Sequence, residues 1–219
     1  MISLMTNSPI AVDSDDHIHP DGVHLDNNMD YVFVDNVEKH FDKKIKMLDL
    51  GCAGGELVCR MHERGHTSVG LEGSDHCLNY NGVGEKPRGY ENWQKYGNKI
   101  LFTCDVTKDF QLLEDGSTVT FNLITCFDVI EHFYEHQLDN FFRNVQKHLD
   151  KDGIFVASIA LFDLVKSQGV NWHKCVESKE WWDNKTSQYF DPITYPFGIT
   201  NRGQSLHSDR EFVFAGKLK

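Results

Sequence analysis

The amino-acid sequence predicts a doubly wound α/β fold, in which helices cover both faces of a mostly parallel β-sheet. Five short apolar segments are rich in β-branched and aromatic residues and lack clean alternation, as strands buried on both faces do. The stretches between them are long enough for crossover helices. A glycine-rich loop follows the first segment directly, where folds of this class bind ligands.

The predicted strands cover residues 45–50, 67–72, 100–104, 121–127 and 153–160. The clearest helix spans 135–149, because Leu138, Phe141, Phe142 and Val145 recur at helical spacing. The sequence DKDG at 150–153 predicts a turn that ends it. A shorter helix is predicted over 55–64, with Gly65 as its C-cap. The alternating tail at 210–219 predicts a final strand near an antiparallel edge.

Residues 1–28 are polar and rich in Asp and His, which suggests a lead-in or lid. We expect residues 29–219 to form one domain. Two stretches interrupt its strand–helix alternation and are interpreted as insertions: a polar, glycine-rich one at about 81–99, and an aromatic one at about 166–198.

Composition and charge limit the classes of function. The 219-residue chain is 40% hydrophobic and carries a formal net charge of −11, which opposes tight binding to a phosphate backbone. It has no run of 18 apolar residues and no basic, apolar leader, so we expect no membrane partner. None of the six cysteines forms a CxxC pair, which favours reduced, buried thiols in a cytoplasmic protein.

The loop after the first strand lies in the sequence MLDLGCAGGELVCR at 47–60. A dinucleotide-binding loop would carry glycine at positions 53 and 56, where this chain has Ala53 and Glu56. A glutamate there would repel a pyrophosphate. The pattern instead suits a ligand that carries a carboxylate and an ammonium group.

Over residues 40–160 the chain resembles the class I S-adenosylmethionine-dependent methyltransferases. The resemblance rests on the acidic, glycine-rich loop, on VGLEGSD and LFTCDV at the next two strand ends, and on NLITCFDVIEHF at the fourth. It implies a seven-stranded, mostly parallel sheet and S-adenosylmethionine as cofactor. It further implies that the methionine part of the cofactor is held by Asp49, Gly51, Cys52, Ala53 and Gly55.

In this family an acid at the end of the second strand binds the ribose hydroxyls, a role that falls to Glu72 with Gly73 beside it. The resemblance assigns Asp105 to the adenine amino group and Val106 to the ring. It places Phe127 and Asp128 beside the cofactor. The alternative is that Asp49 and Glu72 only cap turns.

Two histidines are candidate catalytic bases, His132 after the fourth strand and His173 in NWHKC. His132 could instead be structural, and the loop of His173 could be a surface loop anchored by Trp181 and Trp182. Trp172 and His173 are candidate acceptor-binding residues, and we expect 166–198 to build most of the acceptor pocket, with help from the 81–99 insertion and the N-terminal lead-in. The histidines of DDHIHPDGVH at 15–24 would need to converge to bind a metal, and we expect no metal site there.

These observations predict methyl transfer from S-adenosylmethionine to a small-molecule acceptor, by analogy a sugar or polysaccharide precursor. One rival is a protein methyltransferase. Another is a non-catalytic module that keeps the fold for binding, which the intact Asp49, Glu72 and Asp105 disfavour.

Overall fold

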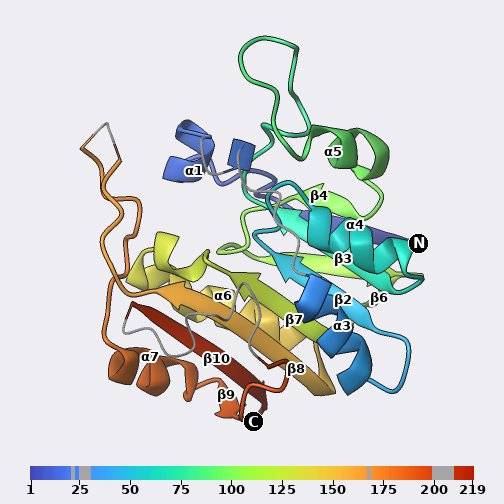
Figure 1. Cartoon of the computed structure of the whole chain (residues 1–219), viewed down its shortest axis with the longest axis vertical. Coiled ribbons are helices and arrows are strands. Elements are labelled where there is room, and N and C mark those ends of the chain that lie inside the picture. Colours follow the sequence, from blue (N-terminus) through green and yellow to red (C-terminus); the bar gives the residue numbers. More distant parts are fainter. Residues whose placement is uncertain (21–22, 25–30, 167–168, 199–209) are drawn as a thin grey trace.

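The main sheet has seven strands in the order β4-β3-β2-β7-β8-β10-β9 (Figure 1). The structure is a computed structural model that describes residues 1–20, 23–24, 31–166, 169–198 and 210–219. The parallel strands are β2 (Lys46–Leu50), β3 (Thr67–Glu72), β4 (Leu101–Thr103), β7 (Phe121–Phe127) and β8 (Leu149–Ala160). β10 (Glu211–Leu218) runs antiparallel to β8, and β9 (Phe190–Pro192) pairs antiparallel with β10 at the edge. The predicted fold class is confirmed, including the antiparallel final strand.

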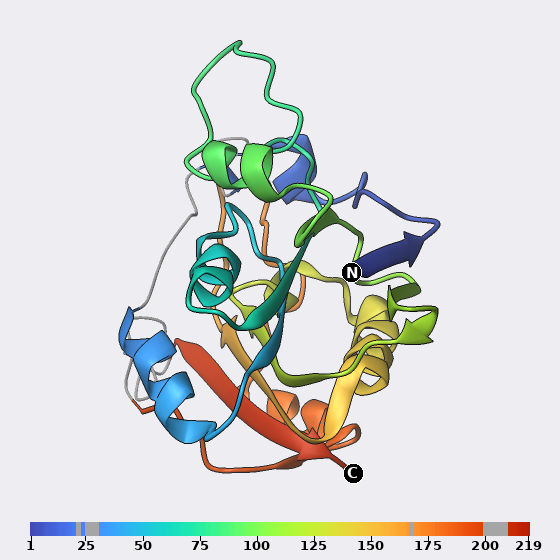
Figure 2. The ribbon, with the colours of Figure 1, turned by 90° about the vertical axis from the view of Figure 1, so that its right-hand side faces the viewer.

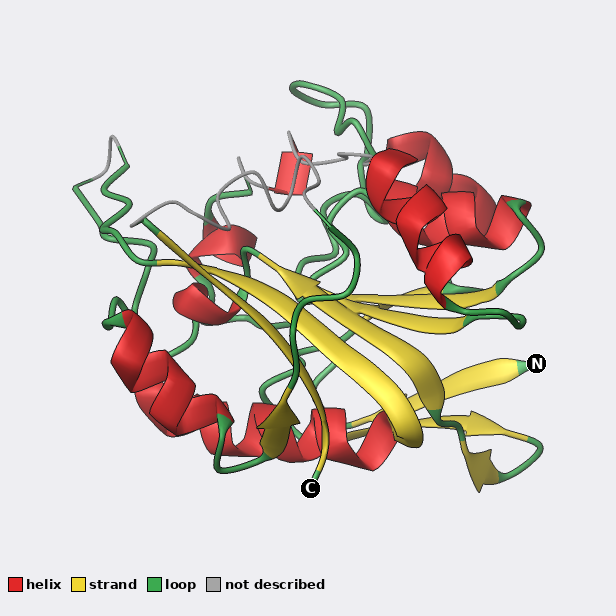
Figure 3. Ribbon diagram, turned by 60° about the horizontal axis from the view of Figure 1, so that its bottom comes forward, coloured by secondary structure: helices red, strands yellow, loops and turns green. Residues whose placement is uncertain are grey.

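Helices lie on both faces of this sheet (Figure 3). α3 (Tyr31–His40), α4 (Glu56–Glu63) and α5 (Tyr90–Tyr96) pack over one face, and α6 (Glu135–His148) and α7 (Lys179–Thr186) over the other. β7 serves both cores because its side chains alternate: Ile124 joins the cluster that holds Phe141 of α6, and Leu123 joins the one that holds Phe33 of α3.

The predicted turn after the long helix is wrong. α6 ends at His148, and β8 begins at once with Leu149. The residues DKDG stay within β8, where the pairing with β7 shifts from Phe121↔Leu149 to Leu123↔Ile154. A side chain at Gly153 would place its Cβ 2.9 Å from the carbonyl oxygen of Phe121, so the glycine permits a close backbone approach. The local turn signal therefore marks an irregularity inside a strand.

A second sheet, which the sequence did not predict, lies beside the first (Figure 2). It is antiparallel and joins β1 (Ile2–Thr6), β5 (Phe110–Glu114) and β6 (Ser117–Thr118). The predicted polar lead-in thus contains a strand and a short helix, α1 (Asp15–Ile18). β1 was missed because its partner lies more than 100 residues away in the sequence.

The 81–99 insertion carries α5, whose Trp93 is buried and donates an N–H hydrogen bond to the carbonyl of Ala53, 2.8 Å away. The insertion therefore holds the glycine-rich loop in place through this hydrogen bond. All six cysteines are buried free thiols, as expected. Among the described residues no helix combines the length and apolar character needed to cross a bilayer.

Candidate functional site

A cleft of about 1180 Å³ opens at the carboxyl ends of the parallel strands. In the sheet, β3 and then β4 lie on one side of β2, and the chain crosses back to place β7 on the other side of β2. The loops after β2 and β7 therefore diverge at this switch point, where open α/β sheets bind ligands. The cleft is lined by these loops, by the ends of β3 and β4, and by residues of the N-terminal segment 7–17.

The glycine-rich loop is held in a left-handed backbone by its own hydrogen bonds. Gly51 has φ 77°, and its N–H and that of Cys52 both donate to the carbonyl of Leu71 in β3, at 2.8 and 3.0 Å. A Cβ on Gly51 would lie 2.4 Å from a methyl of Val129, so the loops after β2 and β7 touch only because this residue is glycine. Ala53, which replaces a family glycine, also has a positive φ of 44°.

Glu72 connects β3 to the loop. Its side chain is 7% exposed, and its two carboxylate oxygens accept hydrogen bonds from the backbone N–H groups of Ala53 at 2.8 Å and Ser74 at 3.0 Å. A carboxylate offers about four acceptor sites, so hydroxyl groups of a ligand can be bound in addition. Glu72 and its neighbour Gly73 line the cleft.

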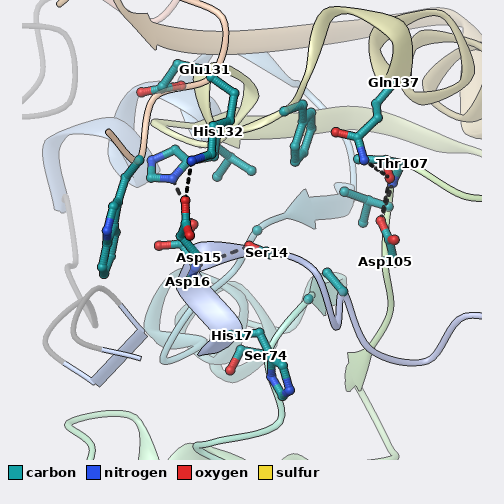
Figure 4. Close-up of a pocket in the computed structure, with 18 of the residues that line it drawn as sticks. Ser14, Asp15, Asp16, His17, Ser74, Asp105, Thr107, Glu131, His132 and Gln137 are labelled. Atoms are coloured by element: carbon teal, nitrogen blue, oxygen red, sulfur yellow. Dashed lines mark hydrogen bonds and ion pairs between the residues drawn. The ribbon is translucent and has the colours of Figure 1, made fainter. Parts of the chain in front are cut away.

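At the end of β4, Asp105 Oδ1 accepts hydrogen bonds from the N–H and the hydroxyl of Thr107, at 3.0 and 2.6 Å. This turn fixes the carboxylate at the cleft wall beside Val106. Figure 4 shows Asp105 and Thr107 at one end of the cleft, with Glu131 and His132 at the other.

Phe127 and Asp128 line the cleft where β7 ends. Asp128 has φ 55° and is held by Ser158 of β8, whose hydroxyl donates to Asp128 Oδ1 at 2.7 Å. Glu211 of β10 also lines the cleft here, and burial next to the Asp128 charge raises the pKa of its carboxyl to about 7.

Three of the predicted cofactor residues do not line the cleft: Asp49, Cys52 and Gly55. Asp49 is buried and accepts a 2.6 Å hydrogen bond from the hydroxyl of Thr125 in the neighbouring strand. Cys52 is buried against Gly70, and a Cβ on Gly55 would clash with Leu101. In the structure these three residues support the loop from behind.

A cluster of one carboxylate and two imidazoles lies at the other end. Glu131 and His132 belong to a 3-10 turn (Ile130–His132) after β7, and His173 follows β8 in the chain. Glu131 is fully buried, and burial raises the pKa of its carboxyl to about 8. The two rings lie with their centroids 4.9 Å apart.

The pKa values of the two histidines are shifted in opposite directions. Burial alone would lower the pKa of His132, but Asp16, whose Oδ2 lies 2.7 Å from His132 Nδ1, and the nearby Glu131 and Asp128 together raise it. Burial lowers the pKa of His173, and its Nδ1 lies 2.6 Å from the carbonyl oxygen of Phe162, to which it donates. His173 therefore carries a proton on Nδ1 and leaves Nε2 as an acceptor.

The sequence predicted which segments would line an acceptor pocket, and the observed cleft is lined partly by other segments. Of the aromatic stretch 166–198, the lining residues are Lys166, Trp172, His173 and Lys174, and no residue of 81–99 lines the cleft. Trp182, Phe190 and Phe197 are fully buried, because they fill the space over β8 and β10 or beside α3. The N-terminal segment contributes more of the wall than expected.

That segment is tied to the site by several contacts. Asp105 donates its N–H to the carbonyl of Ser8, and Ala11 donates to that of Gly73. Asp15 of α1 forms an ion pair with Lys174, and Asp16 forms the one with His132. These acids and Glu131 were missed as site residues. The sequence offers a signal only for Glu131, an acid within the apolar run before His132.

Comparison with known proteins places the chain in a family. The family described as "Methyltransferase domain" matches residues 25–193. None of the curated protein sequences matches this chain.

Solved structures share the fold across most of the chain. The PH0226 protein from Pyrococcus horikoshii OT3 is 16% identical, with a TM-score of 0.58, over 90% of this chain and 96% of that one. An S-adenosylmethionine-dependent methyltransferase from Clostridium acetobutylicum ATCC 824 is 15% identical, with a TM-score of 0.58, over 93% and 95%. The glycopeptide N-methyltransferase MtfA, complexed with S-adenosylmethionine, is 13% identical, with a TM-score of 0.51, over 89% and 91%.

These structural matches cover most of the chain and share its fold. The family match covers well over half of the chain, from the residues before α3 to the end of β9. The protein belongs to the methyltransferase domain family and is an S-adenosylmethionine-dependent methyltransferase.

Proposed function

We propose that the cleft binds S-adenosylmethionine at its Gly51–Glu72–Asp105 end and a small methyl acceptor at its Glu131–His132–His173 end. The observation that carries the proposal is that one cleft contains both sets of residues. At about 1180 Å³ it exceeds the roughly 300–1,000 Å³ of common single-ligand pockets, which leaves room for a second small molecule.

The residues at the first end fit the cofactor. The loop lacks a side chain at Gly51, where none could be accommodated, so backbone lies against the cleft. Glu72 would accept from the ribose hydroxyls, and Asp105 and Val106 would hold the adenine. Cys52, Gly55 and Asp49 would shape the loop around the methionine part without lining the cleft, and Ala53, Gly73, Phe127 and Asp128 would complete the wall.

The charge of the cleft favours a neutral or cationic acceptor. Among the described residues its lining includes eight acids and four Lys or Arg: Asp13, Asp15, Asp16, Glu72, Asp105, Asp128, Glu131 and Glu211 against Lys108, Lys166, Lys174 and Arg210. Glu131 and Glu211 have pKa values raised to about 8 and 7, so near pH 7 they are wholly or partly uncharged and the excess of negative charge comes from the six other acids. Like charges would repel a nucleic acid or a phosphorylated precursor. An unphosphorylated sugar or an amine suits this end, and Trp172 offers an aromatic wall.

Methyl transfer needs alignment, exclusion of water and removal of one proton. The acceptor's lone pair attacks the methyl carbon while the carbon–sulfur bond breaks. The electrons of that bond stay on sulfur, and S-adenosylhomocysteine leaves. His173 is neutral, with Nε2 able to take the acceptor's proton. His132, paired with Asp16, would orient the acceptor.

Calorimetric titration with S-adenosylmethionine and S-adenosylhomocysteine, followed by a screen of neutral and cationic acceptors with labelled methyl, tests the proposal. His173→Asn keeps a donor for the Phe162 carbonyl and should lower methyl transfer about 10²-fold or more while cofactor binding persists. Trp172 is 1% exposed, so Trp172→Phe is a safer probe of the acceptor wall than alanine. Wild-type turnover in His173→Asn would move the acceptor elsewhere.

A further inference from the structure

We propose that Glu131, His132 and His173 form a binding site for one divalent transition-metal ion at the acceptor end of the cleft. One ligand atom from each residue lies within 4.8 Å of the other two. Some point is then no farther than about 2.8 Å from all three atoms, and zinc–nitrogen bonds are about 2.0–2.1 Å long. Shifts of at most about 0.8 Å per ligand atom then bring the three atoms to bonding distance.

Each of the three side chains is already held through its other polar atom. Glu131 Oε1 accepts from the N–H of Ala160 at 3.1 Å, and His173 Nδ1 donates to the carbonyl of Phe162. His132 Nδ1 lies 2.7 Å from the Asp16 carboxylate. Metal-binding histidines in proteins are oriented in this way, through a carboxylate or a backbone carbonyl on the second nitrogen.

These contacts leave Glu131 Oε2 and the Nε2 atoms of the two rings as the ligand atoms that we assign to the ion. Glu131 is fully buried, and its Oε2 atom has no hydrogen-bond partner among the described residues. A buried carboxylate oxygen without a partner is unfavourable, and a cation supplies that partner. Glu131 and His132 are seen together with Asp15 and Asp16 in Figure 4.

The donor set selects the kind of ion. Two imidazoles and one carboxylate suit Zn²⁺, Mn²⁺, Fe²⁺ or Co²⁺, whereas Mg²⁺ and Ca²⁺ prefer oxygen ligands. Three protein ligands leave coordination positions open, as in catalytic sites. Because all three residues line the cleft, an acceptor oxygen can occupy such a position.

A role of the ion in activating the acceptor deepens the proposed function and rests on it. Binding of the ion to the three residues does not depend on the proposed function. A bound cation lowers the pKa of a hydroxyl that coordinates it. With the ion in place, the two histidines act as ligands, and the coordinated hydroxyl of the acceptor would lose its proton to solvent before the methyl group is transferred, so His173 is not needed as the base.

The test uses the full chain, stripped of metal with a chelator and titrated with Co²⁺ followed by its visible absorption. We expect one equivalent to bind, Zn²⁺ to displace it, and Mg²⁺ at millimolar concentration to leave it in place. Glu131→Gln keeps the acceptor for Ala160, and His173→Asn keeps the donor to Phe162. Each should weaken Co²⁺ binding 100-fold or more, while exposed His62→Ala binds as wild type.

A second group of histidines is an alternative site for the ion, and a variant there distinguishes the two sites. His76 lies with its ring 5.4 Å from that of His17 and 5.6 Å from that of His24. If His76→Ala loses the ion and Glu131→Gln keeps it, the proposal is overturned. It is also overturned if wild type binds no Co²⁺ while it still binds S-adenosylhomocysteine. Binding of the ion without methyl transfer to any acceptor would leave the metal site standing and count against the proposed function.

Discussion

Gly51 illustrates what a single backbone position controls at this site. It combines a positive φ with a steric limit, since an added Cβ would meet Val129 at 2.4 Å. Gly65 offers a matched comparison, because it has φ 88° but nothing within 4 Å of an added Cβ. The difference between alanine substitutions at the two positions separates backbone strain from the clash.

Gly65→Ala should lower the free energy of unfolding by about 1–2 kcal/mol, the strain of a left-handed alanine. Gly51→Ala should cost more and should also weaken S-adenosylmethionine binding. Adding Val129→Ala to Gly51→Ala should restore part of the loss, since it removes the clashing methyls. Urea unfolding of the variants measures this, and equal losses at Gly51 and Gly65 would contradict it.

Glu72 accepts two backbone hydrogen bonds in the structure, and we propose that it also binds the ribose of the cofactor. Glu72→Ala should reduce S-adenosylmethionine affinity about ten- to a hundred-fold, because charge-assisted hydrogen bonds contribute roughly 1.5–3 kcal/mol. It should also lower the melting temperature, since Ala53 and Ser74 lose their acceptor. The exposed Glu63→Ala on α4 is the control. Calorimetry and thermal unfolding measure both effects, and unchanged affinity would remove Glu72 from the site.

Residues of the site differ in how far the sequence could reveal them. Gly51, Glu72 and Asp105 stand at strand ends in a recognisable pattern, and the structure places all three at the cleft. Asp16 had no such signal, because its contact with His132 joins residues more than 100 positions apart. Glu131 lay inside the motif, but only the fold shows that its carboxylate is buried beside two imidazoles.

At the scale of elements, a buried histidine provides one of the hydrogen bonds between α6 and the small sheet, besides the one from Lys147 to the carbonyl of Phe110. His148, the last residue of α6, accepts a hydrogen bond at Nε2 from the N–H of Leu112 in β5, at 3.1 Å, and its Nδ1 lies 2.9 Å from the Asn144 carbonyl. The bond at Nε2 requires the neutral ring, because a protonated Nε2 cannot accept, whereas Nδ1 donates to the Asn144 carbonyl in either state. Burial lowers the pKa of His148 from 6.5 to about 4.

A histidine whose pKa is lower in the folded state stabilises the fold above its unfolded pKa. This contribution is lost as the pH falls from about 6.5 to 4, because the unfolded chain takes up the proton first. For His148 it amounts to about 2–3 kcal/mol between pH 7 and 4.5. The raised pKa values of Glu131 and Glu211 make the folded state more stable as the pH falls over this range. The pH dependence of the wild-type protein alone therefore does not reveal the contribution of His148.

The comparison with His148→Gln isolates the effect. Urea unfolding at pH 7 and pH 4.5 should show wild type losing about 2–3 kcal/mol relative to the variant. The variant will be less stable at pH 7, because the buried N–H of Leu112 loses its ring acceptor. If both proteins respond equally to pH, His148 does not titrate as its surroundings imply.

Elements were predictable where the pattern is local. The helical spacing of α6 and the apolar runs of the parallel strands depend only on neighbours in the chain, and both were found. β1 and β5 were not, because their pairing is remote and their exposed faces dilute the apolar signal. The bulge in β8 was read as a turn, because glycine and aspartate favour both.

At the scale of the whole molecule, the cleft brings together segments from the two ends of the chain. The N-terminal segment contacts the end of β3 through Ala11 and the stretch after β8 through the Asp15–Lys174 ion pair. β10, near the C-terminus, contributes Glu211. Ligand binding should therefore stabilise the folded chain as a unit.

Cofactor binding gives this coupling a measurable size. S-adenosylhomocysteine at about 100 times its Kd should add roughly 2.7 kcal/mol to the free energy of unfolding. For a chain of this length that corresponds to a rise in melting temperature of about 5–10 °C. NAD at the same concentration should give no shift, since Glu56 begins α4 where a dinucleotide loop needs glycine. Thermal unfolding of the metal-free protein with each ligand measures this. Equal stabilisation by NAD would contradict the assignment of the loop, and no stabilisation by S-adenosylhomocysteine would contradict the placement of the cofactor in this cleft.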